Sequence, residues 1–418
     1  MSESPKIEET LVCPACTLLC DGIPLDANGQ PDLKDVGCRQ VRQFFQIPPC
    51  TESCWVDGKE VDHASAVSAT TKLLQAAKSP LITGLDAMTT QAQQWAWKLA
   101  EGLGCFLDTS ITNKGRGHQF TLAKVGKVTA TLGEVVNRSD LLIFWYPDFD
   151  LRTLLNRLHR ISVDRKFVVI TDQQRDCEVA NQIIRVPIDQ AVTFATVLRL
   201  ILENISCDLN SVVSQTGVPA ETFQELASFI QSANYGTMVQ STPAGTDAAF
   251  DVLDDTLARM VRKLNDTTRF VSFKIRQDQN GLSAENVLAW GSGFQAGICF
   301  ARGFPESFGL EYSTERLLAN RECDAVLLAS GFLWESSWAS LSPGAKDHLS
   351  QIPKVLLGSV TDLNWEVRFD VGTVGIDFSG EYCRTDNVSL PVDAIHRSVD
   401  RRSSEQILES IFRAIDAV

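Results

Sequence analysis

The sequence predicts an α/β protein with two doubly wound α/β domains and a small cysteine-rich module at its N-terminus. Continuous apolar runs, such as LLIFW at 141–145 and FVVIT at 167–171, are typical of parallel strands that are buried on both faces of a sheet. Amphipathic segments of helical length lie between these runs, and the alternation predicts helices on both sides of a parallel sheet. The chain has 418 residues and too many such runs for one sheet, so we expect two sheets.

The expected elements follow this alternation along the chain. Residues 1–55 form the cysteine-rich module, in which Gly22, Asn28–Gly29 and Gly37 predict turns between short strands. From Trp55 onward the pattern changes to alternating helices and strands. The expected helices cover 62–78, 91–104, 191–205, 221–233, 248–264 and 404–415. The expected strands cover 81–85, 140–146, 167–171, 183–186, 237–240, 269–273, 324–330, 354–358 and 371–377.

The composition excludes several classes of function. With a net charge of −14 and no basic patch, the chain is not expected to bind nucleic acid. The first ten residues, MSESPKIEET, are acidic and polar, so they do not resemble a secretory signal, and no apolar run is long enough to span a bilayer. Twelve cysteines without an export signal indicate a reducing compartment, and we expect the cytoplasm.

Four cysteines near the N-terminus, Cys13, Cys16, Cys20 and Cys38, form the strongest candidate site. Three thiols within eight residues converge on one point only if the backbone wraps around it, and a distant fourth closes the cage. Four thiolates hold a 4Fe–4S cluster in this way. A structural zinc also takes four thiolates, but usually from two similar pairs. The three-plus-one spacing favours the cluster over zinc, and a site that no longer binds metal is the third alternative.

Two glycine-rich segments are weaker candidates. Gly291–Gly297 resembles a dinucleotide-binding fingerprint, but it is one residue too long and follows an expected helix rather than a strand. Lys114–His118 (KGRGH) is a basic loop that either cradles an anion through backbone N–H groups or simply connects a strand to a helix. No HExxH, GxSxG or Walker motif is present, so the sequence does not support a hydrolase with a local signature.

The cysteine spacing and several longer segments, in the same order along the chain, resemble the B subunit of formylmethanofuran dehydrogenase. This family is one of the molybdenum and tungsten bis-pterin (molybdopterin) oxidoreductases. The most specific match is TLGEVVNRSDLLIFW at 131–145. The other matching segments are VVITDQQRD at 168–176, LAWGSGFQAGICFARGFPESFGLEYSTERLL at 288–318 and GEYCRTDNVSLP at 380–391. The resemblance implies a formate dehydrogenase/DMSO reductase-like fold (domains 1–3), in which two α/β domains sandwich a pterin-bound metal.

The resemblance also implies a domain division and a set of site residues. The first α/β domain is discontinuous and comprises 56–110 with 305–418, and the second comprises 111–304. The family's active-site loop corresponds here to Lys114, Gly115, Arg116, Gly117 and His118. The pterin side of the family's site corresponds here to Glu134, Asp172, Arg175 and Arg302.

The active-site loop departs from the family pattern at the metal ligand. In the redox members a cysteine or selenocysteine, followed by His-Gly, binds the metal seventeen residues before the threonine of TLGE. Counting back from Thr131 leads to Lys114 and then Gly115, and Cys105 lies nine residues further upstream. A protonated lysine cannot replace a soft anionic ligand. We therefore expect a vestigial loop, no catalytic residue, and no tungsten or molybdenum pterin in this chain.

Family members without the metal ligand resemble the B subunit of the bacterial formyltransferase/hydrolase complex. That complex moves a formyl group between tetrahydromethanopterin and a methanofuran-type carrier and releases formate. The resemblance implies an amidohydrolase-like A subunit for hydrolysis, a D subunit for formyl transfer and, as a further partner, a C subunit. This chain is then expected to be a non-redox scaffold with no chemistry of its own.

Two other functions stay open at the level of the sequence. One is a redox-active formylmethanofuran dehydrogenase B subunit with a tungsten or molybdenum bis-pterin, and the other is a free-standing, metal-stabilised binding protein. Metal analysis separates the non-redox scaffold from the redox-active subunit, and co-purification with three other subunits separates both of these from the free-standing protein. Two tryptophan pairs, Trp95 with Trp97 and Trp334 with Trp338, are either contacts with such subunits or core residues.

Overall fold

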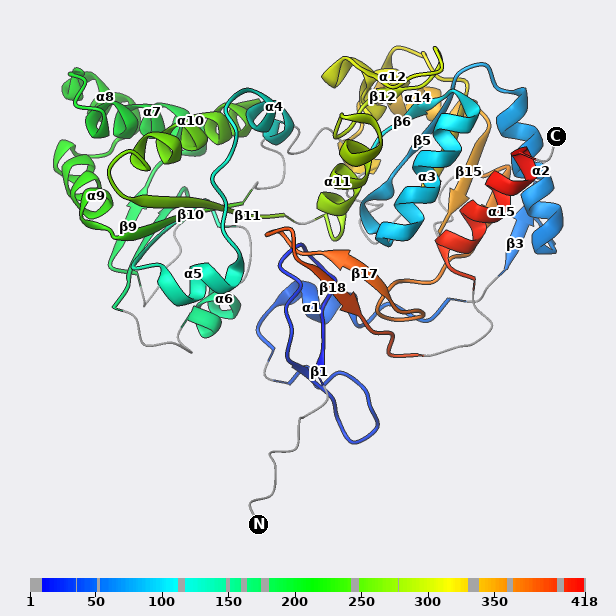
Figure 1. The fold of residues 1–418 in the computed structure, drawn as a ribbon, viewed down its shortest axis with the longest axis horizontal. Helices are drawn as coiled ribbons and strands as arrows, with labels where there is room; N and C mark the ends of the chain where they lie inside the picture. Colours follow the sequence, from blue (N-terminus) through cyan, green and yellow to red (C-terminus); the bar gives the residue numbers. More distant parts are fainter. Residues whose placement is uncertain are drawn as a thin grey trace. The chain divides into compact units, whose positions relative to one another are not determined.

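The structure is a computed structural model in which the chain forms two compact units. It describes residues 10–34, 36–50, 53–111, 117–147, 151–158, 164–173, 180–241, 248–276, 278–329, 338–358, 364–396 and 402–416. The first unit comprises Met1–Asn113 and Gln277–Val418, and the second comprises Lys114–Arg276. Figure 1 shows the elements of both units.

The first unit contains a nine-stranded sheet, two small antiparallel strand pairs, and helices on both faces of the large sheet. Its helices are α1 (Arg39–Phe44), α2 (His63–Ala76), η1 (Leu85–Ala87), α3 (Thr90–Leu103), α11 (Gly281–Ser292), η3 (Gly309–Tyr312), α12 (Thr314–Ala319), α14 (Pro343–Gln351) and α15 (Ser404–Asp416). Its strands are β1 (Thr10–Leu11), β2 (Ile23–Pro24), β3 (Cys54–Val56), β4 (Lys59–Val61), β5 (Pro80–Thr83), β6 (Phe106–Leu107), β12 (Ile298–Cys299), β13 (Glu306–Ser307), β14 (Ala325–Ala329), β15 (Lys354–Leu357), β16 (Val367–Phe369), β17 (Gly380–Cys383) and β18 (Ser389–Val392).

The large sheet is parallel at its centre and antiparallel at both edges. Its strand order is β13-β12-β6-β5-β14-β15-β16-β3-β4, and the five strands from β6 to β16 run parallel. Strands β5 and β14 are neighbours although they lie far apart in the sequence, so the strand order reverses between them. The carboxyl ends of strands at such a switch point are where open α/β sheets usually bind ligands.

Alternate residues of the central strands point to opposite faces, and each face has its own core. Ile82 and Leu327 pack in a cluster that includes residues of α2, α3, α11 and α15. Their sequence neighbours Leu81 and Val326 pack in a second cluster with residues of α12 and α14. This arrangement explains the continuous apolar runs, because both faces of the strands are covered.

Helix α3 shows how local sequence fixes the element boundaries. The Thr89 side chain accepts a hydrogen bond from the Ala92 N–H (3.1 Å) and so caps the start of the helix. Ala92, Ala96 and Ala100 recur every four residues and are fully buried on one face. The helix ends at Gly104, whose φ of 64° lies in the left-handed region that glycine adopts without strain.

The second unit is a five-stranded parallel sheet covered by helices. Its helices are α4 (Gly117–Lys124), α5 (Leu132–Arg138), α6 (Leu151–Leu158), η2 (Ile188–Gln190), α7 (Ala191–Leu202), α8 (Leu209–Thr216), α9 (Ala220–Ser232) and α10 (Ala248–Leu264). Its strands are β7 (Leu141–Trp145), β8 (Lys166–Thr171), β9 (Gln182–Arg185), β10 (Tyr235–Ser241) and β11 (Arg269–Ile275). The strand order is β11-β10-β7-β8-β9, so this sheet has its switch point between β7 and β10.

One face of this second sheet carries a large hydrophobic core. Ile143, Trp145 and Ile170 point into it from the strands, and Phe194 and Phe223 fill it from α7 and α9. Figure 1 shows α7–α10 on this face and α5 and α6 on the other. The expected mixed α/β fold with parallel sheets is therefore confirmed.

The division into units differs from the expected domain boundaries. The expected second domain extended to residue 304, but the chain returns to the first unit at Gln277. The reason is pairing, because β12 hydrogen-bonds to β6 and α11 packs on α3 in the first unit. The cysteine-rich segment is also part of the first unit rather than a separate body.

One expected strand is absent. Residues 371–377 (VGTVGID) form a turn with an isolated bridge between Val374 and Phe378, and the strand of this region is β16, at Val367–Phe369. The buried Asp377 carboxylate accepts a hydrogen bond from the Thr373 N–H (2.7 Å), and its own N–H donates to the Thr373 carbonyl (2.8 Å). These two hydrogen bonds stabilise a turn, and the segment therefore does not adopt the extended conformation of a strand.

Among the residues that the structure describes, no helix combines the length and the apolar character needed to cross a membrane.

Candidate functional site

The N-terminal cysteines lie on a loop that wraps back on itself. The Cys13 N–H donates to the Cys20 carbonyl (2.8 Å), and the Leu19 N–H donates to the Cys16 carbonyl (3.2 Å). Leu19 adopts a positive φ of 41°, which is uncommon for a residue other than glycine. Three of the four predicted ligands therefore lie on one closed loop, as the spacing suggested.

Residues from near the C-terminus form the core beneath this loop. The fully buried Leu19 side chain packs with Val374, Tyr382 and Val392. The Thr385 N–H donates to the Thr17 carbonyl (2.8 Å), so the β17–β18 pair is tied directly to the loop. The expected separate module at 1–55 did not include this contact, although one of the packing residues, Tyr382, lies in the matching segment GEYCRTDNVSLP.

The four thiols share one electrostatic environment. Burial raises the pKa of Cys13 well above its usual value, and Cys16, Cys20 and Cys38 raise it further. Burial also raises the pKa of Cys16 to about 12, with further contributions from Cys20, Cys38 and the Asp278 carboxylate. Without a metal, Cys13 and Cys16 are therefore protonated at neutral pH, and a metal has to displace these protons.

The four cysteines have the right chemistry to bind a metal or cluster as thiolates, but their side chains are not arranged around one point. The residues are of the type that holds an iron–sulfur cluster or zinc, and they influence one another's charge. Across the described part of the chain, however, no three or more His, Cys, Asp or Glu side chains are arranged to hold a metal ion.

The structure describes only part of the predicted active-site loop. Lys114, Gly115, Arg116 and Arg175 lie outside the described residues. Gly117 and His118 begin α4, and their side chains are outside the description as well.

The other residues expected on the pterin side do not gather at one point within the second unit. Glu134 forms a capping box with Thr131 at the start of α5 and raises the pKa of Tyr235, the first residue of β10, after the larger effect of burial. Asp172 directly follows β8 and so lies at the carboxyl ends of the strands, whereas Tyr235 lies at the amino end of β10. Arg302 belongs to the first unit, where its Nη1 lies 3.2 Å from Glu306 Oε1 on the surface.

The carboxyl edge of the second sheet holds a buried ion cluster that the sequence analysis missed. Lys127 Nζ lies 2.6 Å and 2.8 Å from the two Asp254 carboxylate oxygens, and Lys274 Nζ lies 3.8 Å from Oδ2. The Lys127 and Asp254 side chains are only 4% and 5% exposed. The sequence does contain a sign of this cluster, because Asp254 lies on the apolar face of α10 beside Leu253 and Leu257.

A buried carboxylate lies at the carboxyl end of β6 in the first sheet. Asp108, directly after β6, is fully buried and accepts hydrogen bonds from the N–H groups of Thr109 (2.9 Å) and Gly297 (3.2 Å). It also accepts from the Thr314 N–H (2.7 Å) and hydroxyl (2.8 Å), and the Thr314 Oγ1 lies 2.6 Å from Thr83 Oγ1. The protein's own groups thus bind this carboxylate at the carboxyl ends of β5 and β6.

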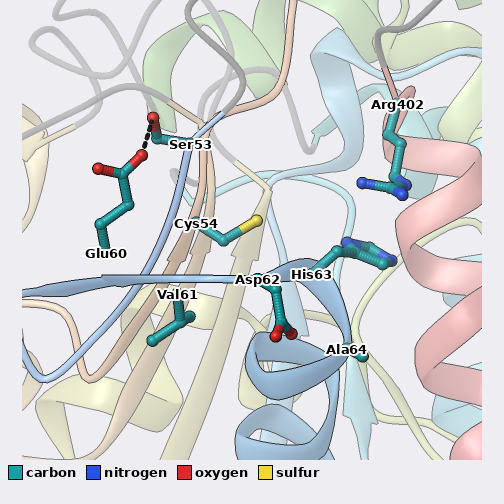
Figure 2. A pocket seen from close by; sticks show the side chains of 8 residues that line it. All are labelled: Ser53, Cys54, Glu60, Val61, Asp62, His63, Ala64 and Arg402. Carbon is teal, nitrogen blue, oxygen red and sulfur yellow. Dashed lines mark hydrogen bonds between the residues drawn. The ribbon is translucent and has the colours of Figure 1, made fainter.

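A cavity of about 520 Å³ opens in the first unit near β3, β4 and the start of α2. Figure 2 shows the residues that line it, with the Ser53 hydroxyl donating to Glu60 (2.8 Å). The His63 ring makes an edge contact with Phe369 (5.8 Å between centroids). Its Nε2 is buried and has no hydrogen-bond partner among the described residues. The lining residues are Ser53, Cys54, Glu60, Val61, Asp62, His63, Ala64 and Arg402.

His63 is expected to make the protein less stable in mild acid. Burial lowers the pKa of His63 below its usual value, Arg402 lowers it further, and Asp62 opposes the shift. The unfolded chain therefore takes up this proton at a higher pH than the folded chain, so stability falls as the pH drops below the usual histidine value of about 6.5. The urea midpoint of wild type should fall more between pH 7.5 and 5.5 than that of His63→Gln. Equal falls would show that His63 titrates normally.

The tryptophan pairs and the glycine segment have structural explanations in the first unit. Trp95 packs against the core of α2, α3 and α15 and lies 5.6 Å from the Phe412 ring. A side chain at Gly291 would meet the Trp97 ring at 2.5 Å, so this glycine allows α11 to approach α3 and is not part of a nucleotide loop. Trp338 packs against the core beneath α12 and α14, and Trp334 lies outside the described residues.

The chain is an α/β protein with two parallel-sheet units and a folded N-terminal cysteine loop. Comparisons with known proteins show which proteins of this class it is similar to. No protein-family model matches the chain. It is 24% identical to the B subunit of the tungsten-containing formylmethanofuran dehydrogenase 2 of Methanocaldococcus jannaschii, over 92% of this chain and 93% of that relative. The corresponding Methanococcus maripaludis protein is 23% identical over 98% of this chain and 99% of its own length.

A third relative is the B subunit of the formyltransferase/hydrolase complex Fhc of Methylorubrum extorquens. It is 24% identical to this chain, over 66% of this chain and 74% of that relative. The fold is also similar to one chain of the crystal structure of the M. extorquens complex FhcABCD with methylofuran, with a TM-score of 0.71 and 20% identity. That match covers 87% of this chain and 99% of the other. The resemblance to these B subunits is confirmed: the chain is their homologue.

Proposed function

We propose that the chain is the B subunit of a formyltransferase/hydrolase complex in tetrahydromethanopterin-dependent one-carbon metabolism. The observation that carries the proposal is Lys114–Gly115, which stands where redox members of the family have a metal-binding cysteine followed by histidine. A lysine ammonium does not bind tungsten or molybdenum as a thiolate does. No redox step is therefore assigned to this chain, and its formate dehydrogenase/DMSO reductase-like architecture serves as a scaffold.

The proposal places the chemistry on the other members of the complex. An amidohydrolase-like A subunit hydrolyses the formyl group, the D subunit transfers it, and the C subunit completes the assembly. The relative named as the B subunit of Fhc and the fold shared with a chain of the FhcABCD structure support this assignment. The internal hydrogen bonds of Asp108 at the first sheet's carboxyl edge agree with a structural role.

A redox-active formylmethanofuran dehydrogenase is the second candidate function. Two relatives that match almost the whole chain are named as tungsten-containing enzymes, and the four cysteines needed for an electron-transfer cluster are present. The missing metal ligand at position 114 is what makes this candidate weaker.

Purification of the native assembly tests the proposed function. A tag on the chromosomal copy of this chain should bring down homologues of the A, C and D subunits, and the isolated assembly should release formate from formyl-tetrahydromethanopterin. A control strain carries the same tag on an unrelated protein of similar abundance. Recovery of this chain alone would overturn the proposal in favour of a free-standing protein.

We also propose that Cys13, Cys16, Cys20 and Cys38 hold a 4Fe–4S cluster, which supplies one-electron transfer when it is bound. The wrapped loop and the shared electrostatic environment of Cys13 and Cys16 support this assignment. Because no electron-accepting metal is expected in this chain, the cluster would act mainly by stabilising the loop. The zinc alternative uses the same four thiols.

Anaerobically purified protein is expected to contain about four iron and about four sulfide per chain. The Cys16→Ser variant should lose both and expose residues 13–38 to hydrogen exchange. Cys207→Ser, in the second unit, is the matched control and should keep the iron. Zinc in place of iron would support the alternative ligand, and a metal-free wild type with a protected loop would contradict any metal at this site.

A further inference from the structure

The cavity at the start of α2 has the size of a small-molecule site. Its volume of about 520 Å³ lies within the roughly 300–1,000 Å³ that ligand pockets usually have. Three segments of the first unit form its wall: the hairpin of β3 and β4, the first residues of α2, and Arg402, which precedes α15. Val61 and Ala64 give it a small apolar surface. We call it the α2 cavity.

Two nitrogen-bearing side chains of the α2 cavity have no acceptor among the described residues. His63 Nε2 is buried and forms no hydrogen bond with them. Arg402 forms no hydrogen bond or ion pair within the part of the chain that the structure describes. Figure 2 shows the Arg402 guanidinium beside the His63 ring, and its charge lowers the pKa of His63 after the larger effect of burial. A buried polar atom without a partner costs free energy, so an acceptor that reaches both side chains would be bound favourably.

The two carboxylates of the α2 cavity are engaged elsewhere. Asp62 Oδ1 accepts a hydrogen bond from the Ser65 N–H (2.7 Å) and caps α2. Glu60 Oε1 accepts from the Ser53 hydroxyl (2.8 Å). In Figure 2 the Asp62 carboxylate points away from Arg402, and Glu60 points toward Ser53. The nitrogen groups of Arg402 and His63 are therefore available to an acceptor from outside the chain.

The charges around the α2 cavity select a monoanion. His63 is neutral at pH 7 because its pKa is lowered, so Arg402 supplies the positive charge. Glu60 and Asp62 add negative charge to the wall, which would repel a phosphate dianion more strongly than a monoanion. A carboxylate carries a single negative charge and binds a guanidinium through two parallel hydrogen bonds. It still has lone pairs that can accept from the His63 N–H.

We propose that the α2 cavity binds a small organic carboxylate. The carboxylate group of this ligand lies between the Arg402 guanidinium and His63 Nε2, and its short apolar body packs against Val61 and Ala64. The observation that carries the inference is the buried His63 Nε2 beside a guanidinium, with no acceptor for either among the described residues. The inference goes beyond the proposed function and does not depend on it.

Titration of the purified chain with butyrate tests the site. The chain has five histidines, so the His63 ring resonances can be assigned by NMR from their absence in His63→Gln. At constant ionic strength, butyrate should shift these resonances in a saturable way, with a Kd in the millimolar range that suits a ligand of this size. Butyramide, which has a similar shape without the charge, and inorganic phosphate should each bind at least roughly tenfold more weakly.

Two arginine variants test the position of the carboxylate group. Arg402→Gln should weaken butyrate binding roughly tenfold or more, because charge-assisted hydrogen bonds are lost. Arg413→Gln is the matched control, since Arg413 is exposed near the other end of α15 and pairs with Glu409 (2.5 Å). This control makes the same change in net charge and should leave the Kd of butyrate unchanged.

The opposite results would contradict the inference. Absence of a saturable shift of the His63 resonances with butyrate overturns the site. Binding of butyramide or phosphate as tightly as butyrate overturns the carboxylate as its ligand. Equal effects of Arg402→Gln and Arg413→Gln would show that butyrate responds only to the overall charge of the chain.

Discussion

The Asp254→Asn variant is expected to lower the free energy of unfolding of the second unit by about 3–5 kcal/mol. Asp254 is the common partner of Lys127 and Lys274, and Lys127 is almost completely buried with it. An asparagine removes the negative charge that the two lysine ammonium groups share inside the unit. Hydrogen exchange of β10 and β11 measures this change for the second unit by itself, because the strands of a core exchange through its unfolding.

The next residue along α10 provides the control. Asp255 pairs with Arg259 at 2.6 Å, but these side chains are 32% and 49% exposed. An exposed ion pair four residues apart on a helix contributes little to stability, because water screens its charges. Asp255→Asn should therefore change the exchange of β10 and β11 very little. Similar effects from the two adjacent substitutions would contradict the structural role given to the ion cluster.

The Asp108→Asn variant is expected to destabilise the first unit by about 3 kcal/mol. The carboxylate accepts four hydrogen bonds from Thr109, Gly297 and Thr314, whereas an amide has one accepting oxygen and turns its own donors toward the rest. Each buried donor left without an acceptor costs about 1–3 kcal/mol. The measurement is the hydrogen exchange of β5 and β14, which flank the switch point of this sheet.

An exposed aspartate with similar bonds is the matched control for Asp108. Asp26 accepts from the N–H groups of Asn28 (2.8 Å) and Gln30 (2.9 Å) in an exposed turn. Water replaces these bonds when the acceptor is lost, so Asp26→Asn should lower the free energy of unfolding far less than Asp108→Asn does. A small effect at Asp108 would mean that water reaches the carboxyl edge of the sheet.

Much of the fold could be predicted from the sequence because most elements carry a local signal. The buried run at 141–145 and the capped, alanine-rich face of α3 each specify their element within a short window. The expected strand at 371–377 was wrong because its two glycines and Asp377 favour a turn that apolar content does not reveal. The loop turn at Asn28–Gly29 is present, with Gly29 at a φ of 73°.

The contacts that organise the candidate site could not be predicted, because they join residues far apart in the sequence. The loop with Cys13 and Cys20 packs on Tyr382, and Asp108 is held by Thr314. No spacing rule connects such positions without an alignment or a structure. The family resemblance did identify the departure at Lys114, since it supplied the register in which the missing ligand could be recognised.

The measurement that tests the central claim most directly is the tungsten and molybdenum content of the assembly purified through this chain. Because Lys114 stands in the position of the metal ligand, the account predicts far less than one such metal per chain, with no pterin released on denaturation. About one tungsten or molybdenum per chain, with extractable pterin, would contradict the assignment of a non-redox scaffold and favour formylmethanofuran dehydrogenase.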